Sequence, residues 1–414
     1  MGHKYSALLA ALIFSLCAGI AAAAPAPLRV GVICPLTGSQ SYTGQLIKEA
    51  STLAVKEINE KGGIQGHPIE LFVENDEFQT PKSVAAAQKL ITQRKVHVLN
   101  GPLASSAVAA CQKLTDKDIP HVTSCGSASK LTEEPHPWFF RLTLADKYQT
   151  AVLVKLAVKD LGLSRVAILA ESGSHGQGTI ESWTKDLAQY NLKPVIVERF
   201  EDTDVDFSSQ LTKAKNAQPD SMVIASLQPQ SGANLAKQAK EIGLNVQIFT
   251  SSSVAGSLDF LNLAGNSAEG FIGPCSFLPT NPDPTVQVFT KTFKAAYGHL
   301  PEGKEAPQTY DILKILAQYL NKKKGDGKYQ FPLEFTDAAL VKDRAQIREA
   351  LMTVKGYRGV VGIEVNFGKE PNPKDRDGIK SPLIAVVKGG DWIPLSAAKS
   401  VLKGGKWVPL ASEN

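Results

Sequence analysis

Two short segments of the chain place serine hydroxyls and unpaired backbone N–H groups where they could hold an anion. Residues 99–107 read LNGPLASSA, which predicts a strand end, a Gly-Pro turn and then a helix that opens at Ser105 and Ser106. The first N–H groups of a helix lack partners within it and carry a partial positive charge, so this layout suits a carboxylate. Either serine could instead be a helix cap, the commonest role of serine at that place.

A second polar turn follows the next predicted strand, in residues 123–129, which read TSCGSAS. Gly126 and Ser127 stand at its centre. From the layout of the first segment, we expect Ser105 and Ser106 to be candidate ligand-binding residues.

Enzyme and metal motifs are missing from the sequence. There is no G-x-S-x-G or G-x-G-x-x-G pattern, and the glycines of residues 173–178, GSHGQG, have the wrong spacing. The segment nearest to a phosphate-binding loop, residues 298–305, ends in Glu305 where a metal-binding Ser or Thr is needed. The seven histidines show no H-x-x-x-H spacing. We expect no catalytic residues, no metal and no cofactor.

Apolar runs and helical patterns alternate along the chain from Arg29 onward, which is typical of a parallel sheet covered by helices. The pattern starts afresh after Arg141, which predicts a second unit of the same α/β class. The first series has predicted strands at 29–34, 69–73, 96–100 and 121–123. Its helices are one after the first strand, with apolar residues from Leu46 to Ile58 on one face, and two at 81–94 and 105–117. The second has strands at 166–170, 195–200, 221–225 and 246–250 and helices at 148–161, 178–190, 207–216 and 232–242.

A chain of 414 residues is too long for one compact core, so two doubly wound lobes are expected. The helix at 306–320 returns to the first lobe, while strands at 361–366 and 383–387 belong to the second. We expect the chain to cross between lobes near Arg141, Gly273 and Lys355. The predicted division is 1–24 signal peptide, 25–141 plus 274–355 lobe 1, and 142–273 plus 356–414 lobe 2.

The tail contains a short duplication. Residues 388–395 read KGGDWIPL and residues 403–410 read KGGKWVPL, each a Gly-Gly turn that runs into a tryptophan-containing strand. Small strands or hairpins are predicted there. Trp392 and Trp407 either pack the tail or stack on a ligand.

Residues 53–71, LAVKEINEKGGIQGHPIEL, with Asn75 and Asp76 just beyond, closely resemble the first lobe of the periplasmic branched-chain amino-acid type binding proteins. The resemblance implies a type I periplasmic binding fold: two lobes with parallel sheets, three crossover hinge strands and a ligand cleft between the lobes. It also implies closure over a small ligand, which is delivered to the membrane permease of an ABC importer. In these binders a Ser of G-P-L-x-S and small residues of an S-x-x-A-T turn hold the ligand carboxylate. Ser105 matches the first motif; Gly126 and Ser127 lie at the second, which is one residue shorter here.

The second lobe departs from this family pattern at three positions. In the family, an aromatic residue usually precedes the first Gly of the segment that reads HGQG here, and this chain has His175 at that position. A further aromatic residue of the family is replaced by Leu227. The family's acidic residue for the ligand ammonium falls in a turn that here contains Ser252. A buried ammonium without a carboxylate partner costs several kcal/mol. The departures favour a ligand without an α-amino group.

We therefore expect a small organic carboxylate, aromatic or branched, with Tyr42, His175 and Leu227 around its far end. The alternative is an amino acid whose ammonium meets an acid elsewhere, such as Glu171 or Asp146. Other functions with this fold are a ligand-sensing receptor for a small amide or acid and, more distantly, a secreted hydrolase.

The N-terminus carries Lys4, an apolar stretch at 7–23 and four alanines at 21–24, the layout of a cleaved export signal. A membrane anchor is the alternative, although the stretch is short and rich in alanine. We expect a monomer in the periplasm. The whole sequence carries a net charge of +5, which falls to +4 without Lys4, and its basic residues are spread along the chain, so no nucleic-acid partner is predicted. Of the five cysteines, Cys17 lies in the apolar stretch; the other four, Cys34, Cys111, Cys125 and Cys275, form one bridge or stay as buried thiols.

Overall fold

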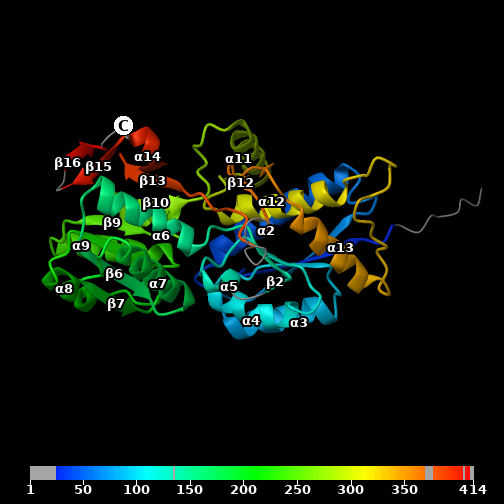
Figure 1. Cartoon of the computed structure of the whole chain (residues 1–414), viewed down its shortest axis with the longest axis horizontal. Helices are drawn as coiled ribbons and strands as arrows, with labels where there is room; N and C mark the ends of the chain where they lie inside the picture. Colours follow the sequence, from blue (N-terminus) through cyan, green and yellow to red (C-terminus); the bar gives the residue numbers. More distant parts are fainter. Residues whose placement is uncertain (1–24, 134–135, 369–375, 404–405, 411–414) are drawn as a thin grey trace, which may run out of the picture.

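The computed structural model describes residues 25–133, 136–368, 376–403 and 406–410. The predicted export signal, residues 1–24, lies outside this range. Within it the chain forms two α/β lobes side by side, with the first lobe on the right of Figure 1 and the second on the left. The predicted fold class, two lobes with mainly parallel sheets, is confirmed.

The first lobe is built on a five-stranded parallel sheet with the order β2-β1-β3-β4-β5. The strand β1 (Leu28–Cys34) is almost wholly buried, as expected for a parallel strand covered on both faces. The other strands are β2 (Ile69–Asn75), β3 (Val98–Asn100), β4 (His121–Thr123) and β5 (Phe139–Arg141). The helices of this part are α2 (Ser41–Glu60), α3 (Thr80–Thr92), α4 (Ser105–Thr115) and α5 (Lys130–Glu133).

Three later helices return to the first lobe: α11 (Pro284–Tyr297), α12 (Glu305–Leu320) and α13 (Leu340–Met352). The helix α12 lies along α2, and Ile312 and Leu316 share a core with Leu46 and Leu53 (Figure 1). The helix expected near 306–320 thus packs against the first lobe.

The second lobe has a seven-stranded sheet with the order β14-β13-β10-β9-β8-β6-β7, in which β13 and β14 run antiparallel to their neighbours. Its strands are β6 (Val166–Glu171), β7 (Ile196–Phe200), β8 (Ser221–Ala225), β9 (Gln247–Thr250), β10 (Ile272–Cys275), β13 (Leu383–Lys388) and β14 (Asp391–Pro394). Its helices are α6 (Asp146–Lys155), which continues as a π-helical segment to Asp160, α7 (Ser174–Ala188), α8 (Ser208–Asn216), α9 (Pro229–Glu241) and α10 (Leu258–Ala264).

The last crossover lies further along the chain than the expected position near Lys355. The small hairpin of β11 (Tyr357–Arg358) and β12 (Glu364–Val365) packs into the core of the first lobe. The buried carboxylate of Asp311 in α12 holds this segment, because it accepts the N–H groups of Val360 and Val361 at 3.0 Å each. Residues 356–367 therefore pack on the first lobe, not on the second, and only two residues of the expected strand 361–366 form β12.

The duplicated tail motif forms two hairpins, as predicted: β13 with β14, and β15 (Ser400–Lys403) with β16 (Lys406–Pro409). Between them stands a short helix, α14 (Leu395–Ala398). The four cysteines at 34, 111, 125 and 275 are buried and free. None of the helices in the described part of the chain is long and apolar enough to cross a membrane.

Candidate functional site

The two donor turns of the first lobe lie together at the carboxyl ends of β3 and β4. The hydroxyl of Ser105, at the start of α4, accepts the N–H of Ala128 at 3.3 Å and so ties the helix to the second turn. A small cavity of about 20 Å³ opens against Ser105, Gly126 and Ser127. Its opposite wall comes from the second lobe, with Leu227 after β8 and Ser253 after β9.

The lobes touch each other across this cavity. The Ser127 hydroxyl lies 2.9 Å from Nδ1 of His175, and the side-chain amide of Gln40 donates to the carbonyl of Leu227 at 3.2 Å. An adjoining cavity of about 70 Å³ is lined by Tyr42, Leu46, Phe78 and Leu103 of the first lobe and by Leu227 and Ser253 of the second. In this conformation, side chains of the two lobes occupy most of the cleft, and the two small cavities remain.

Most of the predicted ligand residues come together here. Ser105, Gly126, Ser127 and Leu227 line the small cavity, and Tyr42 lines the adjoining one. Two others are placed differently. Ser106 lines a larger opening beside the cleft. Ser252, in the turn after β9, is buried and lines neither cavity, whereas its neighbour Ser253 lines both.

His175 lies in the first turn of α7, which begins four residues before the expected start at residue 178. Glu171, at the end of β6, stabilises this early start because its carboxylate accepts the N–H groups of Gly173 and, at 2.6 Å, Gly176. Burial, aided by the charge of Lys304, lowers the pKa of His175 to about 3, so its ring is neutral at pH 7. Its Nε2 atom has no partner among the described residues.

Lys304 is a site residue that sequence reasoning missed. It precedes α12, it is only 7% exposed, and it lines the small cavity. Its ammonium donates to the carbonyl of Ser252 at 2.8 Å, across the lobes, and lies 2.9 Å from the carboxylate of Glu305. Because an ammonium has three donors, one more can serve a ligand. The segment before α12 carried no local signal for this role, since its burial arises from the contact between lobes.

Several buried polar atoms around the cavity lack partners within the described part of the chain. They are the hydroxyls of Thr143 and Ser252, Nε2 of His175 and one carboxylate oxygen of Asp146. Buried polar groups in native proteins almost always have a partner, and each exception calls for an explanation. A polar ligand or ordered water between the lobes would supply the missing contacts.

Asp146 is a buried acid next to the binding turn, where its backbone N–H donates to the carbonyl of Ser127 at 2.8 Å. Burial raises its pKa from 3.8 to about 7, and the hydrogen bond from Ser127 opposes the shift. At pH values between 3.8 and about 7, the folded protein therefore binds more protons than the unfolded chain. This group thus makes the free energy of unfolding fall as pH rises through that range.

We expect Asp146→Asn to flatten this dependence. In urea unfolding at about pH 5 and about pH 8, wild type should lose more stability at the higher pH than the variant does. An equal loss in both proteins would contradict the assignment.

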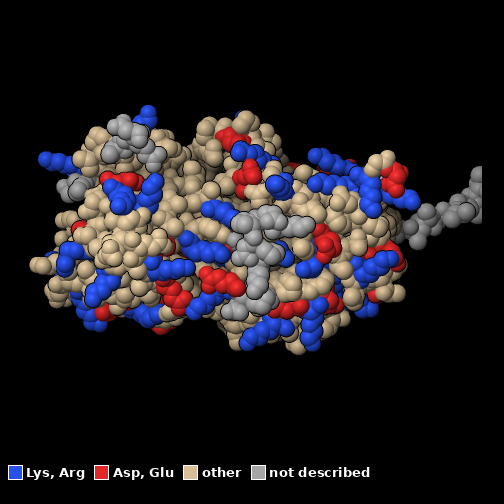
Figure 2. Space-filling model, viewed as in Figure 1, with Lys and Arg blue, Asp and Glu red and all other residues tan. Residues whose placement is uncertain are grey.

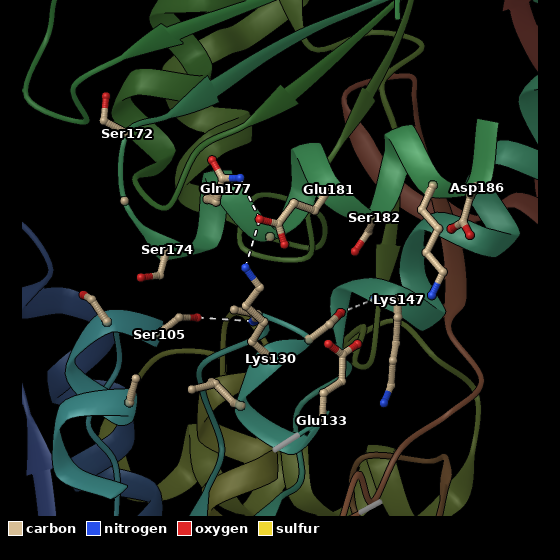
Figure 3. Close-up of a pocket in the computed structure, with 18 of the residues that line it drawn as sticks. Ser105, Lys130, Glu133, Lys147, Ser172, Ser174, Gln177, Glu181, Ser182 and Asp186 are labelled. Atoms are coloured by element: carbon tan, nitrogen blue, oxygen red, sulfur yellow. Dashed lines mark hydrogen bonds and ion pairs between the residues drawn. The ribbon is translucent and has the colours of Figure 1, made fainter. Parts of the chain in front are cut away.

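A larger opening of about 850 Å³ lies between α4 and α5 of the first lobe and α7 of the second. Figure 3 shows Lys130 of α5 and Glu181 of α7 facing each other across it; their charged groups are 3.0 Å apart. Gln177 donates to the same Glu181 carboxylate at 2.7 Å. This opening leads from the solvent to Ser105. No cluster of three or more potential metal ligands occurs in the residues that the structure describes.

Solved structures of known proteins share this architecture. The leucine-binding protein LivK of Thermotoga maritima superposes with a TM-score of 0.75, at 23% identity, over 89% of this chain and 97% of its own. A solute-binding protein of an ABC transporter from Rhodopseudomonas palustris BisB5, solved with 3,4-dihydroxybenzoic acid, gives a TM-score of 0.71 at 23% identity over 89% and 95%.

Relatives by sequence include the Leu/Ile/Val-binding protein BraC3 of Rhizobium johnstonii, 28% identical over 266 residues, which are 64% of this chain and 71% of that protein. The Leu/Ile/Val-binding protein of Escherichia coli K12 is 26% identical over 272 residues, 66% of this chain and 73% of that protein. The family model for periplasmic binding proteins matches residues 27–385. The chain therefore belongs to the periplasmic binding protein family and is a binding protein, not an enzyme.

Proposed function

We propose that this protein captures a small organic carboxylate without an α-amino group and delivers it to the membrane permease of an ABC importer. The observation that carries the proposal is the pairing of a buried cation, Lys304, with the hydroxyl turns of the first lobe, opposite a second-lobe turn made of serines. The names of the relatives support the transport role.

The first lobe offers a carboxylate hydroxyl and N–H donors together with one ammonium, whose partner Glu305 lines the same cavity. Ser105 stands at the N-terminus of α4, Ser127 presents a hydroxyl, and the Lys304 ammonium lies at the same cavity. Hydrogen bonds to charged groups are worth roughly 1.5–3 kcal/mol each, and burial strengthens them. A carboxylate is the ligand group that suits these donors.

At the small cavity the one lining acid, Glu305, is already paired with Lys304, and Glu171 is occupied by the first turn of α7. Asp259 and Glu302 line the adjoining cavity and not the small one. Asp146 is about half protonated near neutral pH because its pKa is raised to about 7. The turn after β9 contributes only the hydroxyls of Ser251, Ser252 and Ser253.

The adjoining cavity suits an apolar body for the ligand. Leu46, Phe78, Leu103, Leu227 and the ring of Tyr42 form the apolar part of its lining, and the acidic residues of the lining are Asp259, Glu302 and Glu305. A branched or aromatic group would bury apolar surface there, at about 25 cal/mol per Å². The same fold holds an aromatic carboxylate in the Rhodopseudomonas palustris protein. Opening of the lobes about the three crossovers would admit the ligand and closure would trap it.

Isothermal titration calorimetry of the mature protein with benzoate, 4-hydroxycinnamate, leucine and phenylalanine tests the ligand class. We expect binding of an organic carboxylate from the first pair. Tight binding of leucine would contradict the non-amino-acid ligand. For the transport role, genes for permeases and ATPases beside this one are expected, whereas a neighbouring kinase or transcription factor would favour a sensing receptor.

A further inference from the structure

The turn that presents Gly126 and Ser127 to the ligand is held from behind by a buried arginine. Arg141, at the end of β5, has no exposed surface, and its Nη1 atom donates to the carbonyls of Gly126 at 2.9 Å and Ala128 at 2.7 Å. These two carbonyls flank Ser127 in the chain. Arg141 does not line the cavity, so its contacts are to the turn and not to a ligand.

All five guanidinium donors of Arg141 are engaged. Besides the two carbonyls, Nε donates to Asp377 at 2.7 Å, and Nη2 reaches the hydroxyl of Thr132 at 2.9 Å and the same Asp377 carboxylate at 2.6 Å. Asp377 is also fully buried, and the Thr132 hydroxyl donates to its second oxygen at 3.1 Å. A planar fork satisfied at every donor fixes the orientation of its partners.

The geometry of the peptide bond links the hydrogen bonds of Arg141 to the orientation of the ligand-binding turn. In a trans peptide the C=O and the following N–H point in opposite directions. Since the carbonyl of Gly126 points at Arg141, the N–H of Ser127 points away from it, and Gly126 and Ser127 line the cavity on their other side. Without the arginine both carbonyls would lose their buried donor and the turn could rotate.

The same cluster joins the turn to two of the three crossovers. Arg141 opens the first crossover, and residues 376–378 belong to the last one, where backbone hydrogen bonds link Arg141 with Arg376 at 3.0 Å and Gly378 at 2.7 Å. On the second-lobe side, the ammonium of Lys147 in α6 lies 3.1 Å from Asp377, and the Lys147 N–H donates to the hydroxyl of Ser129 at 2.9 Å. A change in hinge angle therefore acts on the groups that hold the turn.

We propose that Arg141 and Asp377 form a positioning pair, which orients the carboxylate-binding turn and couples it to the hinge. This inference rests on the proposed function for the identity of the ligand group. The pair touches no ligand itself and acts through Gly126, Ser127 and Ala128.

The test compares Arg141→Lys with a matched control in the same lobe. Arg344 of α13 is also buried, at 4% exposed, and donates to the carbonyl of Val96 at 3.0 and 2.7 Å and to Asp118 at 3.2 Å, away from the cleft. Arg344→Lys removes a comparable fork without touching the turn. Hydrogen exchange followed by mass spectrometry on ligand-free protein reads the order of residues 126–132 directly.

In Arg141→Lys we expect exchange in residues 126–132 to accelerate by about tenfold or more, and affinity for the bound carboxylate, benzoate or 4-hydroxycinnamate, to fall by about tenfold or more. Arg344→Lys should leave the exchange of residues 126–132 and the carboxylate affinity unchanged, while lowering the melting temperature. If Arg141→Lys does not fold, Asp377→Asn, which keeps the side-chain size, should show the same pattern more weakly.

Unchanged exchange at 126–132 in Arg141→Lys would overturn the inference, and so would accelerated exchange with unchanged affinity. If wild type binds neither carboxylate, the proposed function fails, and the exchange result alone decides whether Arg141 positions the turn.

Discussion

Replacing Lys304 with methionine should weaken binding of the organic carboxylate by roughly 10- to 100-fold, because it removes a charge-assisted contact worth about 1.5–3 kcal/mol. Lys304 is the buried cation of the small cavity and touches both lobes, through Ser252 on one side and Glu305 on its own. Its loss should therefore also weaken the closed state.

The single variant leaves Glu305 without its partner, which by itself can destabilise a protein by several kcal/mol. The double variant Lys304→Met with Glu305→Gln removes both charges and should fold well while still binding weakly. Lys314→Met is the matched control on α12, since Lys314 pairs with Glu57 at 2.7 Å away from the cavity. Calorimetry and thermal unfolding of these variants separate affinity from stability. A double variant that binds as tightly as wild type would exclude Lys304 from recognition.

The second large effect is expected at Trp392, where alanine should lower the free energy of unfolding by about 3–5 kcal/mol without changing ligand affinity. Trp392 is 3% exposed in β14, its ring lies 6.1 Å from that of Phe260, and its indole N–H donates to the carbonyl of Ser257. These contacts favour the packing role over ligand stacking.

Trp407, at the equivalent place of the duplicated motif, provides the control. It is only partly buried in the β15–β16 hairpin, so Trp407→Ala should cost clearly less stability. Urea unfolding and calorimetry on both variants test this pair. A loss of affinity in Trp392→Ala that exceeds its loss of stability would restore the stacking role.

Local patterns predicted most strands and most helices, because parallel strands buried on both faces read as continuous apolar runs. The short strands β5 and β10 were not predicted. β4 and β8 begin and end where the sequence placed them. The helix α11 was missed although Asp283 caps it, Pro284 opens it and Gly298 ends it in the left-handed region. Those are ordinary helix signals, so the sequence is sufficient to predict this helix.

Other errors depend on contacts between distant residues. The early start of α7 places Gly176 in a helix, against its low helix propensity, and the carboxylate of Glu171 compensates. Likewise, the β11–β12 hairpin packs on the first lobe because the Asp311 carboxylate of α12 meets it there. No local pattern encodes such pairings.

The candidate site divides in the same way. Turn composition pointed to Ser105, Gly126 and Ser127, which lie together at the cavity. Lys304 and Ser253 reach it only because the two lobes meet, and Arg141 supports the turn through side-chain contacts with a segment more than 200 residues later. Ligand contacts by all of these residues remain a prediction.

The central claim is that the cleft binds a carboxylate whose neighbouring carbon carries no ammonium. Leucine and 4-methylpentanoate differ only in that group, so calorimetric titration of the mature protein with the two, and with phenylalanine and 3-phenylpropanoate as a second pair, isolates its contribution. We expect the ammonium-free member of a pair to bind at least about tenfold more tightly, a difference of about 1.4 kcal/mol. Tighter binding of leucine or phenylalanine than of its ammonium-free partner would contradict the account.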